Sequence, residues 1–209
     1  MSRVAQLRSC IFIDRLQPQT MCALGTWISG RLPRADMAAQ VIEIAPGLDI
    51  EPLTDVALKH ARVQAGILVV ERQFGYLEVH GSTDEVHAAT SAVLDALGAA
   101  PEDAVAPQVL ASRVITRLDQ QHAFLINRNR RGSMALPGDS LFVLEMQPAS
   151  YAILATNEAE KSADIRVIDY RMIGATGRVY LAGRQSDVRQ AAEAAETALT
   201  SHALSAVRR

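Results

Sequence analysis

The sequence is poor in aromatic residues and cysteine, and neither sign of charge dominates it. Aromatic residues make up 4% of the 209 residues, two cysteines are present, and the net charge is -2. Without a strong basic excess, no global field favours nucleic acid as a partner. Cys10 and Cys22 both lie in the first half of the chain, so we expect buried, reduced thiols and no disulfide framework.

Long apolar runs are also absent. No stretch approaches the roughly 18 apolar residues of a membrane span. The start, MSRVAQLRSCIFIDRL, lacks the long apolar region of a signal peptide. We therefore expect a cytoplasmic protein that does not enter a membrane.

Motifs for common enzyme chemistry are missing as well. The sequence contains no GxGxxG or GxxxxGK[ST] phosphate loop, no HExxH and no paired CxxC. His80 and His87 are better explained as ordinary polar positions than as metal ligands. Glu71, Arg72 and His80 could form an acid–base group, but nothing places a nucleophile beside them. The sequence thus predicts no enzyme, no metal and no cofactor.

What the sequence does contain is an internal repeat. VIEIAP, residues 41–46, is followed 102 residues later by VLEMQP, residues 143–148. The same offset, without a gap, aligns identical residues along nearly the whole chain, including Ile13 with Ile115, Gln19 with Gln121, Lys59 with Lys161, Gly75 with Gly177 and Leu97 with Leu199. One offset over this length indicates a tandem duplication. It predicts two domains, 1–103 and 104–209, joined by the turn-forming segment 98–107.

Each half opens with the same predicted elements. The β-branched runs at 10–16 and 111–118 predict strands, and turn-rich polar segments at 25–36 and 127–139 follow them. The strands of VIEIAP and VLEMQP end at their prolines, which cannot donate to a central ladder. Helices are then expected from about 51 to 61 and from about 153 to 163.

The second part of each half is a predicted hairpin and a closing helix. The hairpins cover 63–80 and 165–182, each with a loop of about five residues. Ser82 and Glu85 form a candidate capping box for the first closing helix. The fold class is therefore α+β, a tandem duplication of a ferredoxin-like sandwich in which two helices cover a mainly antiparallel sheet.

Three local motifs carry a resemblance to a known family. LKHARV at 58–63 and its second copy, EKSADI at 160–165, match a helix that ends in Lys-x-Ala-x-Val before a strand. ASRVITRL at 111–118 is similar to a strand of the form Ala-Ser-His-Val-Ile-x-Arg, with Arg113 in place of the histidine. RMIGATGRVYLAG at 171–183 matches a glycine-rich hairpin that lines a pore. Together they resemble bacterial microcompartment shell proteins of the tandem-domain class.

The resemblance also fixes an expected arrangement. The Ala-Ser-His strand opens each half here and follows the last helix in the commonest shell domain, so the match is to the circularly permuted variant. This class implies a homotrimer with pseudo-sixfold symmetry, which serves as a tile of a microcompartment shell. The tile would contact other shell proteins at its edges and pass small metabolites or cofactors through a central pore that can be gated.

Under this resemblance, two groups of residues acquire roles. Lys59 and Lys161, which otherwise read as solvated helix-end lysines, would lie along the tile edge. The equivalent hairpin loops would line the pore, with a charged set in the first half and a small, flexible set in the second: Glu71, Arg72, Gln73, Phe74 and Gly75, and Ile173, Gly174, Ala175, Thr176 and Gly177. Some tandem shell proteins hold an iron–sulfur cluster through a cysteine at this loop. Ala175 and Thr176 stand there, so no cluster is expected.

A second interpretation starts from the same duplicated fold. Duplicated α+β units that form oligomers also serve as regulatory domains, so a tandem ferredoxin-like module that senses a small molecule is the alternative. The formation of extended sheets by purified protein would separate the two, since a tile forms them and a sensor does not.

Overall fold

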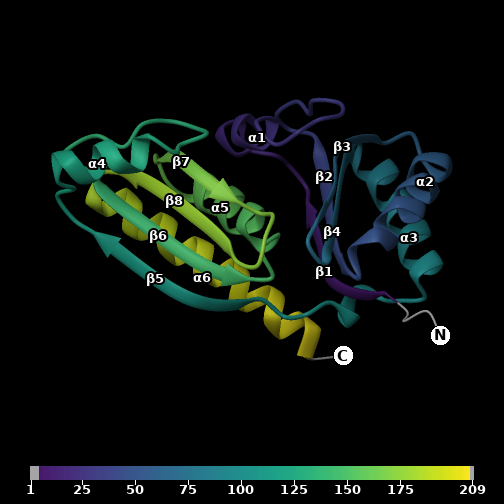
Figure 1. The fold of residues 1–209 in the computed structure, drawn as a ribbon. Helices are drawn as coiled ribbons and strands as arrows, with labels where there is room; N and C mark the ends of the chain where they lie inside the picture. The colour runs from purple at the N-terminus through teal and green to yellow at the C-terminus, as the bar shows by residue number, and fades with distance from the viewer. Residues whose placement is uncertain (1–4, 208–209) are drawn as a thin grey trace. The chain divides into compact units, whose positions relative to one another are not determined.

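The computed structural model describes the backbone of residues 5–207. It forms two compact units, one of residues 5–16 and 27–106 and the other of residues 17–26 and 107–203. Each unit contains one four-stranded antiparallel sheet (Figure 1). The first segment of the second unit, residues 17–26, belongs in sequence to the first repeat.

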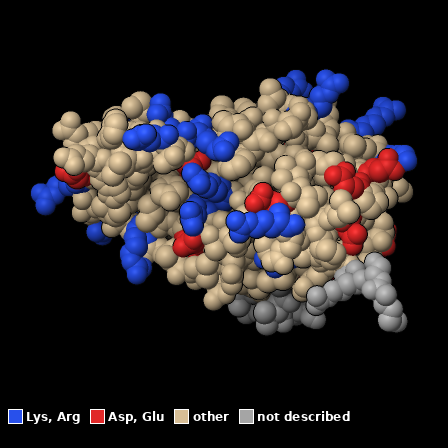
Figure 2. Space-filling view, in the orientation of Figure 1, with Lys and Arg blue, Asp and Glu red and all other residues tan. Residues whose placement is uncertain are grey.

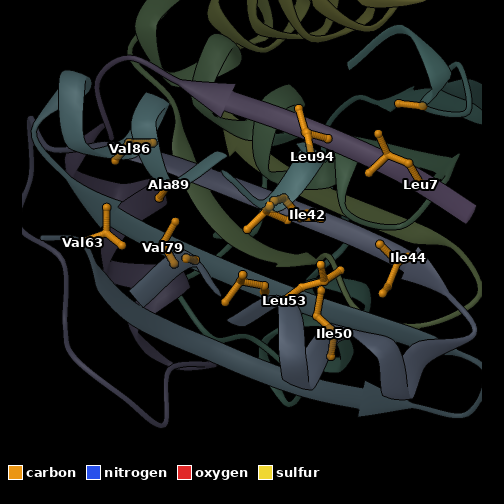
Figure 3. Close-up of a cluster of buried hydrophobic side chains, with 14 of the residues drawn as sticks. Leu7, Ile42, Ile44, Ile50, Leu53, Val63, Val79, Val86, Ala89 and Leu94 are labelled. Carbon is orange, nitrogen blue, oxygen red and sulfur yellow. The ribbon is translucent and has the colours of Figure 1, made fainter. Parts of the chain in front are cut away.

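The first unit is a sheet covered on one face by two helices. Its strands are β1 (Gln6–Ile13), β2 (Ala38–Ala45), β3 (Gln64–Glu71) and β4 (Phe74–Gly81), in the order β1-β2-β4-β3. The helices are α2 (Ile50–His60) and α3 (Thr83–Leu97), and short 3-10 turns lie at Gly47–Asp49 and Pro101–Asp103. Figure 3 shows the core between the two layers, where Ile42 and Ile44 of β2 and Val79 of β4 meet Leu53 of α2 and Ala89 of α3. Alternation along the strands sends these side chains to one face.

The second unit repeats this plan. Its strands are β5 (Gln108–Ile115), β6 (Ser140–Gln147), β7 (Arg166–Arg171) and β8 (Gly177–Gly183), in the order β5-β6-β8-β7. Its helices α5 (Tyr151–Ser162) and α6 (Gln185–Val207) lie on one side of the sheet (Figure 1). A shorter helix, α4 (Gln120–Asn127), packs on the opposite face through Ala123 and Ile126.

The two sheets share their irregularities as well as their order. The ladder between β1 and β2 shifts between Leu7 and Ser9, and the ladder between β5 and β6 shifts at the equivalent Val109 and Ala111. The same holds at Ala65/Ile67 of β3 and Val167/Asp169 of β7. A β-bulge changes the direction in which the side chains of its strand point, so its position is a characteristic feature of a fold. The repeat seen in the sequence is therefore a repeat of backbone geometry, and the predicted α+β duplication is confirmed.

Some predicted elements differ from the observed ones. The opening strands begin at Gln6 and Gln108, earlier than expected. In β1 the alternation of buried and exposed side chains extends upstream of the β-branched run. Helices α1 (Pro18–Gly25) and α4 were missed: each is eight residues long, and both precede segments rich in turn formers. The first hairpin loop is also shorter than the expected five residues, since β3 and β4 are joined by Arg72 and Gln73 alone.

The capping box is half formed. The Ser82 hydroxyl accepts the Glu85 amide, 3.4 Å away, as predicted. The Glu85 carboxylate, however, accepts the backbone N–H of Arg62 at 2.7 Å. That contact ties the start of α3 to the segment that follows α2.

The thiol prediction needs correction. Both cysteines are free, as expected, but Cys22 is exposed and Cys10 is partly buried. Desolvation raises the pKa of Cys10 to about 11, so its thiol stays protonated at neutral pH. Among residues 5–207, no helix is both long and apolar enough to span a bilayer.

Candidate functional site

The first candidate loop is a tight two-residue turn. Glu71, the last residue of β3, is the ladder partner of Phe74, the first residue of β4. Arg72 has a φ of 57°, in the left-handed region that turns require of a central residue. The side chains of Glu71 and Arg72 are exposed, and Arg72 Nε lies 3.8 Å from Glu71 Oε1. At this exposure the pair contributes little stability, so both charges are available to other partners.

The second candidate loop is longer and carries no charge. Met172 to Thr176 join β7 to β8, and Met172 is fully buried while Ala175 is exposed. Gly174 has a φ of 129°, which a residue with a Cβ rarely adopts. The two loops occupy equivalent places in their sheets and differ in chemistry, as the sequence predicted.

A carboxylate from the repeated motif supports each loop. Glu43, the glutamate of VIEIAP, accepts Arg8 Nε at 2.7 Å, and the Arg8 guanidinium lies 4.2 Å from the ring centroid of Phe74. Glu145, the glutamate of VLEMQP, accepts Thr176 Oγ1 at 2.7 Å and Arg178 Nε at 3.2 Å. The hydrogen bonds from Thr176 and Arg178 lower the pKa of Glu145. The sequence contained this signal, a Glu kept at the 102-residue offset, but its role was not predicted.

Close backbone packing holds the base of the first loop. A Cβ on Gly47 would meet the backbone of Phe74 at 2.5 Å, and a Cβ on Gly75 would meet the Ile50 side chain at 2.8 Å. The turn after β2 therefore lies directly against the start of β4. Pro46, the proline of the first repeated motif, follows a cis peptide bond at this turn. Pro148, its counterpart in the second motif, follows a cis peptide bond at the end of β6.

The candidate edge lysines lie at equivalent helix ends. Lys59 Nζ lies 2.5 Å from Asp55 Oδ2 in α2, and Lys161 Nζ lies 2.8 Å from Glu158 Oε1 in α5. The Lys59 side chain is 75% exposed and the Lys161 side chain 30% exposed. The two lysines thus have equivalent positions in the fold, and their side chains differ in solvent exposure.

Two buried acids were not foreseen. Glu78 and His80 of β4 are fully buried, and Glu78 Oε1 lies 2.9 Å from His80 Nδ1. Burial raises the pKa of Glu78, and the hydrogen bond with His80 opposes that rise. In the second unit, burial raises the pKa of Asp169, whose Oδ2 lies 3.3 Å from Arg171 Nε. Their counterparts at the 102-residue offset are uncharged, so the repeat gave no signal for them.

The histidines have separate structural roles. His80 pairs with Glu78, and the His87 ring stacks on Phe12 with centroids 4.3 Å apart. Within the described part of the chain, no three His, Cys, Asp or Glu residues form a group that could hold a metal ion. Figure 2 shows basic side chains in several separate groups over the visible face, with smaller groups of acidic side chains among them.

Comparison with known proteins gives a match for each half. Residues 7–103 match the CsoS1D N-terminal domain, and residues 140–207 match the BMC domain. The chain is 44% identical to the carboxysome shell protein CcmP of Synechococcus elongatus, over 93% of this chain and 92% of that protein. It is 42% identical to the carboxysome shell protein CsoS1D of Prochlorococcus marinus subsp. pastoris, over 93% of this chain and 77% of that protein.

Solved structures agree with these matches. The fused permuted hexameric shell protein MSM0275 from the RMM microcompartment is 72% identical, with a TM-score of 0.93 over 95% of this chain and 98% of that one. The double ringed trimeric shell protein MSM0271 from the same microcompartment is 42% identical, with a TM-score of 0.90 over 94% of this chain and 97% of that one.

The duplicated sandwich and its matched halves define a tandem BMC-domain protein of the permuted type. The chain belongs to the family of bacterial microcompartment shell proteins, which confirms the resemblance inferred from the sequence. The relatives carry the names of shell components, so this family membership assigns the chain a structural role in a shell.

Proposed function

We propose that three copies of the chain form a pseudohexameric ring that serves as one tile of a microcompartment shell. Each chain contributes two units of one fold, so three chains supply six domains around one axis. The observation that carries the proposal is the matched geometry of the two sheets, down to the positions of their bulges. Relatives described as hexameric and as trimeric support the same arrangement.

In this ring, the two candidate loops surround a central pore. Three copies of residues 71–75 alternate with three copies of residues 173–177. The first set brings exposed charge, and the second brings small residues and the left-handed Gly174. The pore passes small metabolites, and ion pairs between Glu71 and Arg72 of neighbouring copies close it.

At the ring's outer edge, Lys59 and Lys161 contact adjoining tiles. Each lysine has a long apolar stem and three donors on its ammonium, which suit a side chain that lies along a neighbouring surface. The partners at this edge are other copies of the ring and other shell proteins.

Mass and sheet formation test the proposal. Native mass spectrometry should give a particle of three times the 22.6 kDa chain. Electron microscopy at high protein concentration should show extended sheets. A stable monomer or dimer would contradict the ring, and a trimer that never forms sheets would favour the sensing module.

A further inference from the structure

Helix α1 is held in the second unit by contacts with α5 and β7 (Figure 1). Its first turn has no cap of its own, since the Gln17 side chain makes no capping hydrogen bond. Glu160 of α5 supplies the cap instead: it accepts the backbone N–H of Gln19 and of Thr20, each at 2.8 Å, and the Thr20 hydroxyl at 2.8 Å. A carboxylate at a helix N-terminus satisfies unpaired amides and complements the helix dipole.

The Gln19 side chain makes a second connection, to the backbone at the start of β7. Its Nε2 donates to the carbonyl of Ile165 at 2.8 Å, and its Oε1 accepts the N–H of Val167 at 3.0 Å. β7 is an edge strand, so its outer backbone groups need partners from outside the sheet. We call this two-bond contact the glutamine clasp.

Helix α4 is the counterpart of α1, and it carries the same glutamine. Gln121 stands at the 102-residue offset from Gln19 and is exposed. The face of α1 that meets the second unit is buried, with Thr20 at 0% and Ala23 at 1% exposure. The equivalent residues of α4 are open, since His122 is exposed and Leu125 is 59% exposed. The docking face of α4 therefore lacks the cover that its counterpart has.

The surface that α4 would need exists in the first unit, at α2 and β3. The edge of β3 matches that of β7 bond for bond: Gly30 N donates to Gly66 O at 3.0 Å, as Gly132 N donates to Ile168 O at 2.9 Å. Val63 and Ala65 are the counterparts, at the 102-residue offset, of Ile165 and Val167, whose backbone groups bond to Gln19 in the glutamine clasp. Two leucines on this surface, Leu58 and Leu68, are 45% and 38% exposed.

One exchange of residue types makes α4 and this surface complementary. Asp119 replaces Gln17, and its carboxylate caps α4 from within, accepting the N–H of Gln121 at 2.8 Å. Leu58 replaces Glu160 on the receiving surface. The surface proposed to receive α4, which is capped by its own Asp119, therefore carries a leucine. The surface that receives α1, which has no acidic cap of its own, carries a glutamate.

A hollow beside α4 is further evidence that this side of the helix is a docking surface. It has a volume of about 430 Å³ and is lined in part by His122, Leu125, Asp169 and Tyr180. The counterparts of His122 and Leu125 on α1, Thr20 and Ala23, are at most 1% exposed within the second unit.

We infer that α4 of one copy docks on α2 and β3 of a second copy, where Gln121 clasps Val63 O and Ala65 N–H and Leu58 covers the self-capped start of α4. This inference rests on the proposed ring and assigns its chain-to-chain joint. The joint between copies is the apolar counterpart of the polar joint that α1 makes within one chain. Three such joints close the ring.

A charge exchange tests the assignment. Leu58→Glu places a carboxylate against Asp119, so the dissociation constant of the trimer should rise by about tenfold or more. Leu58→Glu combined with Asp119→Gln recreates the pairing of Glu160 with Gln17, and should return the constant to within a few-fold of the parent value. Native mass spectrometry over a dilution series measures both, and thermal unfolding checks that each variant folds.

Two matched variants complete the design. Ala88→Glu adds the same charge at an exposed position of α3 and should leave the trimer unchanged. Gln121→Ala should weaken the trimer as Leu58→Glu does. A Leu58→Glu trimer as tight as the parent, or a double variant as weak as the single one, would overturn the assignment while leaving the ring standing. A parent protein that is not trimeric would instead refute the ring.

Discussion

Thr176 donates a hydrogen bond to Glu145 over 2.7 Å, which ties the last residue of the second candidate loop to strand β6. Glu145 is the glutamate of the repeated motif, and Glu43 has the same position under the first loop. The partners differ, because Arg8 and Phe74 replace the hydroxyl donor there. One backbone plan thus supports two loops of different chemistry.

Thr176→Val should loosen the second loop and raise the pKa of Glu145. The Thr176 hydroxyl is the largest cause of the lowered pKa, and Arg178 remains as the second. A lowered carboxyl pKa contributes stability above its unfolded value, near 4.5, and that contribution is lost as the pH falls through the folded value. Carbon-13 NMR titration of the Glu145 carboxyl measures the shift. Thr176→Ser keeps the hydroxyl and should titrate as the parent does, and equal titration of all three proteins would disprove the role of the hydrogen bond.

Glu78→Gln should flatten the dependence of stability on pH. Burial raises the pKa of Glu78 above 4.5, so its contribution to stability is full below that value and is lost as the pH rises through the folded pKa. Each unit of such a shift corresponds to about 1.4 kcal/mol. The free energy of unfolding, measured at pH 5 and pH 8 at one protein concentration, should differ less in the variant. Glu51→Gln, at an exposed position of α2, is the control and should keep the parent's pH dependence.

The sequence predicted the strands, the long helices and the equivalence of the two loops, because each of these leaves a periodic or repeated pattern. It did not predict α1, whose N-terminus is capped by Glu160 from a segment about 140 residues further along the chain. A short helix stabilised by a distant side chain leaves little local signal. The pairing of Glu78 with His80 was not predicted for a similar reason. Both side chains are buried by the fold, and their counterparts in the second repeat are Tyr180 and Ala182, which form no such pair.

Lys59→Ala should weaken the contact between tiles and leave the trimer intact. In the proposed tile the same contact recurs around every ring, so even a modest loss at each one should raise the protein concentration needed for sheets, by several-fold or more. Lys161→Ala should act in the same direction. Electron microscopy of a concentration series measures sheet formation, and native mass spectrometry follows the trimer. If both variants formed sheets at the parent's concentration, the edge assignment would be wrong.

The pairing of Arg72 with Glu71 within one chain is loose, and this is what the proposed gate needs. At 3.8 Å and with Arg72 86% exposed, the pair leaves each charge free to meet a neighbouring copy. Three Arg72 side chains that converge on one axis repel each other, by about a few kcal/mol for each close pair near a protein surface. Three Glu71 carboxylates neutralise them, so alternating ion pairs can close the opening.

The double substitution Glu71→Ala and Arg72→Ala should therefore widen the narrowest part of the pore in a crystal structure of the trimer. Removing both charges at once leaves no unpaired group behind, so the turn itself should keep its conformation. Glu51→Ala removes an exposed carboxylate on α2, outside both loops, and should leave the pore's width unchanged. Partly exposed ion pairs contribute little net stability, so the double variant should unfold within about 1 kcal/mol of the parent protein. A loop that lies far from the threefold axis, or a pore as narrow in the double variant as in the parent, would show that these residues form no gate.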